Sequence, residues 1–138
     1  MLVTLHPRCI CSRATLDELS RLLVQIPAPV RVQILIYQPD TVSAGWSESA
    51  LVTQARSIPG VVVIADPKGL ESERFGMSVS GHTAVYAPDG RLLFSGGITR
   101  ARGHTGENAG SAAILSVVSS RSAPPRTPVF GCSILNPK

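Results

Sequence analysis

Two cysteines near the start of the chain, Cys9 and Cys11, are the residues best suited to chemistry. They stand between the apolar run 2–5 and a stretch with helical periodicity. The start of a helix offers unpaired backbone N–H groups and the positive end of a dipole, which stabilise a thiolate and lower its pKa below roughly 8.5. Because the polar residues Arg8 and Ser12 flank the pair, we expect an exposed turn. The sequence therefore predicts a reactive sulfur at a strand-to-helix junction, with a pair of buried structural thiols as the alternative.

A third cysteine, Cys132, follows a proline-rich stretch, so the three thiols cannot all pair within one chain. A disulfide between Cys9 and Cys11 requires local bending of the backbone, because Cα atoms two residues apart in an extended chain lie near the upper end of the roughly 4.4–6.8 Å that a disulfide spans. Such a bond is strained and easily reduced. If the end of the chain folds back, Cys132 is either a resolving thiol or one half of a long-range disulfide. Otherwise it is a free cysteine in the tail.

Histidine adds a metal alternative to the thiol chemistry. His82 lies in a loop between two predicted elements, where it can stabilise a thiolate, transfer a proton or donate a nitrogen to a metal. Together with Cys9 and Cys11, and with His6 and Cys132 as further donors, it would provide enough soft ligands for Cu(I) or Zn(II). The thiol chemistry needs no cofactor. His82 as a solvated loop residue and His6 as a hydrogen-bonded structural residue are the plainer alternatives.

The hydrophobic pattern indicates alternating strands and helices that must position these residues. Leucine and isoleucine recur at three- and four-residue spacing between Leu16 and Ile26, which predicts an amphipathic helix that ends before Pro27. We expect Ser12 or Thr15 to cap its start. The expected strands are 2–6, 30–37, 61–65, 83–87 and 91–95, the last two joined as a hairpin, and the expected helices after the first are 47–57, 67–75 and 108–119.

This order, β-α-β-α-β-α-β-β-α, predicts an α/β fold with a central mixed sheet and helices on both faces. Residues 120–128 contain three prolines and are not expected to be regular. The segment 103–108 opens the last helix, either as a loop and cap with Thr105 or Asn108 as the capping residue, or as an anion site assisted by Arg100 and Arg102.

Composition limits the classes of function. The chain has 138 residues, 43% of them hydrophobic and 16% charged, which fits one globular domain. Its net charge of +4 comes mostly from arginines scattered singly, and with few aromatic residues this does not favour a nucleic-acid surface. No segment approaches the roughly 18 apolar residues of a membrane span, and residues 1–20 lack the pattern of a secretory signal.

Several segments together resemble bacterial thioredoxin-like proteins of the RedB type. The segments that carry the resemblance are His6-Pro7-Arg8-Cys9-Ile10-Cys11-Ser12, Ile58-Pro59-Gly60-Val61, Arg74-Phe75-Gly76, Ser80-Gly81-His82, the run 90–98, Ala101-Arg102-Gly103-His104, Asn108-Ala109-Gly110 and Pro128-Val129-Phe130-Gly131-Cys132. The resemblance covers nearly the whole chain. It implies a thioredoxin-like domain over residues 1–119, a proline-rich tail over 120–138 that carries Cys132 and folds back, and a redox role. It also implies an extracytoplasmic setting behind an N-terminal anchor that this chain does not show.

The chain departs from ordinary thioredoxins at two points. Its cysteines are separated by one residue instead of two, and Gly81 stands roughly where those proteins have a cis-proline. We expect a thiol-disulfide oxidoreductase that acts on a protein thiol or disulfide partner. In it Cys9 is the preferred nucleophile, and Cys11, Cys132 and His82 are the other catalytic residues. The substrate is expected to contact Pro7, Arg8, Ser80 and Gly81. A metal-delivery protein that uses Cys9, Cys11 and His82, and an interaction module without catalysis, are the alternatives.

Overall fold

The order of strands and helices in the computed structural model, which describes residues 1–39 and 49–134, is the predicted one. The elements are β1 (Leu2–Leu5), α1 (Ile10–Gln25), β2 (Val32–Gln38), α2 (Ala50–Ser57), β3 (Val61–Pro67), α3 (Leu70–Arg74), β4 (Thr83–Tyr86), β5 (Leu92–Gly96) and α4 (Ala109–Val118). The start of the helix predicted for 47–57 and the end of the predicted tail 120–138 lie partly outside the described residues. Within those residues, no helix is long and apolar enough to cross a bilayer.

The five strands form one mixed sheet in the order β3-β2-β1-β4-β5. β1, β2 and β3 are parallel, with Val3 opposite Ile34 and Leu5 opposite Ile36. β4 is antiparallel to β1, and β5 is antiparallel to β4, as the short connection of a hairpin requires. β1 is therefore the central strand, and the chain that leaves its carboxyl end enters α1 from the middle of the sheet.

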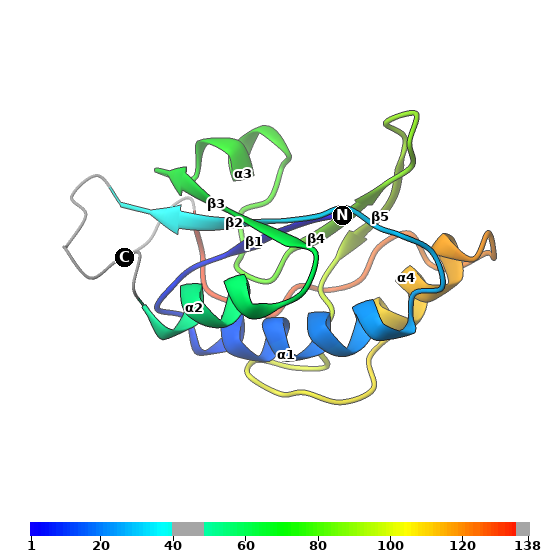
Figure 1. The fold of residues 1–138 in the computed structure, drawn as a ribbon, viewed down its shortest axis with the longest axis horizontal. Helices are drawn as coiled ribbons and strands as arrows, with labels where there is room; N and C mark the ends of the chain where they lie inside the picture. The colour runs from blue at the N-terminus through cyan, green and yellow to red at the C-terminus, as the bar shows by residue number, and fades with distance from the viewer. Residues whose placement is uncertain (40–48, 135–138) are drawn as a thin grey trace.

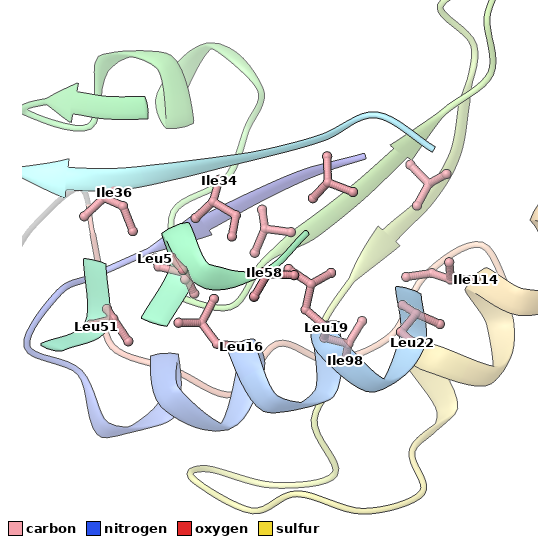
Figure 2. Close-up of a cluster of buried hydrophobic side chains, with 14 of the residues drawn as sticks. Leu5, Leu16, Leu19, Leu22, Ile34, Ile36, Leu51, Ile58, Ile98 and Ile114 are labelled. Carbon is pink, nitrogen blue, oxygen red and sulfur yellow. The ribbon is translucent and has the colours of Figure 1, made fainter. Parts of the chain in front are cut away.

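The helices cover the two faces unequally. α1, α2 and α4 pack on one face, and the short α3 lies on the other (Figure 1). Figure 2 shows the main core between the sheet and the first group of helices, with Leu16 and Leu19 of α1 beneath Ile34 of β2. Burying each of these side chains stabilises the fold by roughly 1.5–3 kcal/mol. The smaller core on the other face is formed by Leu2, Leu35, Met77 and Ala84.

The start of α1 differs from the expected one. The N-cap residue is Cys9, and both Ser12 and Thr15 lie inside the helix, so the prediction that one of them caps it is wrong. The Thr15 hydroxyl donates to the Cys11 carbonyl oxygen at 3.1 Å. The Ser12 hydroxyl donates to the His6 carbonyl oxygen at 2.7 Å, because the chain before the helix bends back over its first turn.

Candidate functional site

The two cysteines lie at the connection between β1 and α1. Cys9 has an extended conformation (φ −94°, ψ 124°) as the N-cap residue, and Cys11 follows in the first turn. Only 5% of Cys9 and 1% of Cys11 is exposed, so the prediction that the two thiols lie on an exposed turn is wrong. Arg8, directly before Cys9, is exposed. Local sequence cannot foresee this burial, because the segments that cover the thiols come from far along the chain.

The first of these segments is the loop 78–82, which contains Ser80, Gly81 and His82. The Gly81 N–H donates to the Thr4 carbonyl oxygen at 2.8 Å, and the Thr4 N–H donates to the His82 carbonyl oxygen at 3.0 Å. The loop therefore extends the backbone pairing between β4 and β1. Gly81 has φ +93°, and a Cβ on it would come within 2.9 Å of the Thr15 hydroxyl oxygen. Glycine is therefore required where the loop passes over α1.

A chain of hydroxyl groups joins this loop to the start of α1. The His6 N–H donates to Ser80 Oγ at 2.9 Å, and Ser80 Oγ lies 2.7 Å from Ser12 Oγ. Because the Ser12 hydroxyl already donates to the His6 carbonyl oxygen, Ser80 must be the donor to Ser12. Each of these hydroxyl groups thus has a defined partner, and hydrogen bonds connect the turn before Cys9 to the loop 78–82.

The second segment is the end of the chain. After α4 the chain crosses back beneath the sheet toward the carboxyl end of β1 (Figure 1). Residue 133 forms an antiparallel bridge with Val79. The Ser80 N–H donates to the Cys132 carbonyl oxygen at 2.8 Å, and the Ile134 N–H donates to the Ser78 carbonyl oxygen at 2.8 Å. This pairing carries Cys132 to the other two cysteines.

The three thiols influence one another strongly. Burial by itself raises the pKa of Cys9, but hydrogen bonds from the thiols and backbone N–H groups of Cys132 and Cys11 outweigh burial, so this pKa lies below its ordinary value. The pKa of Cys11 is raised by burial and by the neighbouring Cys9. The pKa of Cys132 is raised to about 11, first by its hydrogen bond to Cys9 and then by burial. Cys9 is therefore the thiol that ionises first.

Arg102 supplies a positive charge to the same cluster. Its Nη2 atom lies 3.9 Å from Cys132 Sγ, and its guanidinium lowers the pKa of both Cys132 and Cys11. The sequence placed Arg102 beside an anion site at the last helix, and its role near the thiols was missed because the contact spans the loop before α4 and the tail. In that loop Asn108 caps α4 by accepting the Ser111 N–H at 2.8 Å, which confirms the predicted cap. The Gly106 N–H donates to the Glu18 carboxylate at 2.7 Å.

His82 and His6, the two histidines considered as metal ligands, have protein partners. His82 Nε2 lies 2.7 Å from Ser95 Oγ on β5, and burial followed by the charge of Arg126 lowers the pKa of His82. His6 stacks on Tyr37 with ring centroids 5.3 Å apart, and burial followed by Arg8 lowers its pKa.

The metal alternative with Cys9, Cys11 and His82 stays a prediction. Over 1–39 and 49–134, no group of three or more His, Cys, Asp or Glu side chains is placed to hold a metal ion.

The expected substrate-contacting residues fall into two pairs. Pro7 is partly exposed and Arg8 is exposed, and both precede the cysteines at the surface. Ser80 and Gly81 are buried, and Ser80 uses its backbone N–H to hold the tail. Sequence reasoning also missed Gly131, at which a Cβ would collide with the Ser80 carbonyl group. A glycine directly before a cysteine was the only signal that could have indicated this close approach.

Comparison with known proteins identifies the fold and no activity. A solved structure described as that of an uncharacterized conserved protein from Geobacillus kaustophilus matches with a TM-score of 0.72 at 15% sequence identity. The match covers 96% of this chain and 74% of that chain. At this identity the likeness shows a shared α/β fold alone. No protein-family model matches the chain, and no curated protein matches it.

Proposed function

We propose that the chain is a thiol-disulfide oxidoreductase of the thioredoxin-like class, with Cys9 as the attacking thiolate. One observation carries the proposal: Cys9, Cys11 and Cys132 meet at the junction of β1 and α1, and Cys9 alone has a pKa below its ordinary value. The thioredoxin-like assignment is supported by the element order, by the mixed sheet with β1 at its centre, and by the convergence of the RedB-like segments 6–12, 80–82 and 128–132 at this one place.

The reaction proceeds by two exchanges that balance in sulfur and electrons. The Cys9 thiolate attacks one sulfur of a partner disulfide, forms a mixed disulfide and releases the partner's other sulfur as a thiolate that takes up a proton. A second thiolate of this chain, Cys11 or Cys132, then attacks the Cys9 sulfur and releases the partner's remaining thiol. The partner disulfide gains two electrons, and the chain is left with one disulfide. The reverse sequence oxidises a partner dithiol.

The charge of Cys9 determines the order of the two exchange steps. While Cys9 is a thiolate, its charge and its hydrogen bonds hold the pKa of Cys11 and of Cys132 up. Once the Cys9 sulfur is part of a mixed disulfide it carries no charge, and this cause disappears. The guanidinium of Arg102 then favours ionisation of both remaining thiols. The resolving thiol thus becomes more nucleophilic once the first attack has taken place.

The test measures exchange with a fluorescently labelled peptide disulfide. We expect Cys9→Ser to lower the second-order rate constant by at least about 100-fold, because a serine hydroxyl is not ionised at neutral pH. The matched controls are Cys11→Ser and Cys132→Ser, which keep the first attack. At least one of them should accumulate a mixed disulfide at Cys9 that mass spectrometry detects. Exchange by Cys9→Ser at the rate of the parent would overturn the proposal.

A further inference from the structure

The segment 131–134 pairs with residues 78–80 beside the thiols through an isolated antiparallel bridge. It is held there by the two backbone hydrogen bonds between Ser80 and Cys132 and between Ile134 and Ser78, on either side of the Val79–Ser133 bridge. Backbone pairing of this kind is indifferent to most side chains, so an extended peptide from another protein can form the same two bonds. The segment therefore fills a place that a second chain could take.

The same segment closes the site. Cys9 and Cys11 are almost completely buried, although Arg8 and Ile10 on either side of Cys9 are exposed, Ile10 by 80%. The backbone and thiol of Cys132 hydrogen-bond to the Cys9 sulfur, and Arg102 Nη2 lies 3.9 Å from the Cys132 sulfur. Gly131 lies directly on the carbonyl group of Ser80, with no room for a Cβ. With the segment in place, only 5% of Cys9 is exposed to an approaching disulfide.

The segment can leave without the rest of the tail. Closer to α4, the tail is attached separately to β5, where the Ser95 N–H donates to the Pro125 carbonyl oxygen and the Gly97 N–H to the Pro128 carbonyl oxygen. Between that attachment and Gly131 lie only residues 129 and 130, both partly exposed. The attachments of the segment itself include the two backbone bonds, the contacts of Cys132 with Cys9 and Arg102, and the buried side chain of Ile134. Short segments that follow a partly exposed connection are of the kind that opens locally.

We propose that residues 131–134 form a displaceable cover that keeps Cys9 closed until an extended, cysteine-bearing segment of a partner protein pairs with Ser78 and Ser80 in its place. The replacement of the cover by a partner segment rests on the proposed function, whereas the cover itself does not. The cover makes this chain selective for extended peptides, because a small disulfide has no backbone to offer in exchange for the two hydrogen bonds.

The experiment uses the full-length chain with Cys132→Ser, so that only Cys9 and Cys11 react. Adding Gly131→Val forces the segment off the Ser80 carbonyl group, and Thr127→Val is the matched control, since it removes only the hydrogen bond from Thr127 Oγ1 to the Gly97 carbonyl oxygen. Two quantities are measured: the rate at which a bulky aromatic disulfide reagent modifies Cys9, and the hydrogen-exchange protection of the Ser80 N–H. Gly131→Val should raise the modification rate and lower the protection factor by at least tenfold each, and Thr127→Val should change both by less than twofold.

A peptide then tests the vacated edge. A synthetic peptide with the sequence of residues 128–134 and serine at position 132 should bind the Gly131→Val variant and restore protection at Ser80, and it should not bind the control. If Gly131→Val unfolds the chain, Ile134→Ala replaces it, because that substitution weakens the anchor of the segment without a backbone collision. Accessibility and protection that stay unchanged in the opening variant, in a folded chain, overturn the cover.

The outcomes separate the cover from the proposed function. Greater accessibility in chains that catalyse no exchange would leave the cover standing and remove the oxidoreductase. Normal exchange with the peptide disulfide, together with unchanged accessibility, would remove the cover and leave the oxidoreductase standing.

Discussion

Two clusters of buried polar groups border β1, and they are built in opposite ways. The first joins Thr4, Asp66 and Ser72 on the face of the sheet that α3 covers. Asp66 accepts the Glu71 N–H at 2.9 Å, the Ser72 N–H at 3.0 Å and the Ser72 hydroxyl at 2.6 Å. Because the Ser72 hydroxyl donates to Asp66, the Thr4 hydroxyl, 2.6 Å away, must donate to Ser72.

The second cluster follows the end of β1 and contains the three thiols. Here the ionisable groups compete, because ionisation of Cys9 raises the pKa of Cys11 and of Cys132. Only Arg102 contributes a full positive charge among the causes that act on these thiols. Cys9 and Cys11 are buried like the first cluster, and Cys132 is partly exposed. The main difference between the clusters is therefore how completely donors are matched to acceptors. The matched cluster holds the β3–α3 connection in place, and the mismatched one can change its protonation state.

The largest expected effect separates the clusters by stability. Asp66→Ala removes the acceptor of three donors, two of them buried, and we expect the free energy of unfolding to fall by about 3 kcal/mol. Urea denaturation measures this loss. Asp89→Ala is the control, because Asp89 is exposed and accepts only the Arg91 N–H. The alkylation rate of Cys9 should be unchanged in folded Asp66→Ala, and a changed rate would show that the two clusters are coupled.

A smaller effect distinguishes them by pH. Since the native chain raises the pKa of Cys132 from 9.0 to about 11, the unfolded chain loses this proton first as the pH rises between those values. The native state then binds more protons than the unfolded state, so this contribution to stability, present below pH 9, is lost as the pH rises toward 11. Each pKa unit corresponds to roughly 1.4 kcal/mol of stability. Because solvent screens the interactions of a partly exposed thiol, we expect the whole contribution of Cys132 to be about 1 kcal/mol.

The measurement is urea denaturation from pH 8 to 11 for the parent and for Cys132→Ser, which removes this titration. The parent should lose about 1 kcal/mol more than the variant over this range. Parallel stability curves would contradict the proposed interaction between Cys132 and Cys9.

The smallest effect concerns Arg102 and rests on the proposed function. Arg102→Gln removes the charge that lowers the pKa of Cys11 and Cys132, and we expect resolution of the mixed disulfide at pH 7 to slow by about threefold. Because Arg102 is not among the causes that act on Cys9, the first attack should keep its rate. Rapid-mixing kinetics separate the two steps, with Arg100→Gln as the control. Slowing of the first step alone would refute this role.

Much of the fold could be predicted because it depends on periodicity and on strong turn signals. The spacing of Leu16, Leu19 and Leu22 predicted α1 and the face it buries, and the prolines after residue 26 predicted its end. The predicted helix over 67–75 is shorter in the structure, Leu70–Arg74, because Lys68 and Gly69 have left-handed backbone conformations. These follow from the turn that Asp66 organises, which residue preferences do not reveal.

The candidate site was predicted only in its parts. Cys9 and Cys11 were placed correctly at a strand-to-helix junction, but their burial was not foreseen. That burial depends on the loop of Ser80 and on residues 131–134, which lie about half of the chain and most of the chain away from the cysteines in sequence. Pairings of this kind leave no local pattern, because backbone hydrogen bonds do not depend on side-chain identity.

The sequence by itself determined the order of strands and helices and the position of the cysteine pair at the start of α1. These are local properties, determined by periodicity and proline. Only the tertiary structure decided that Cys132 joins Cys9 and Cys11, that the charge of Arg102 acts on Cys11 and Cys132, and that Cys9 has the lowest pKa of the three. A pKa depends on all groups within a few ångströms, and here those groups come from both ends of the chain.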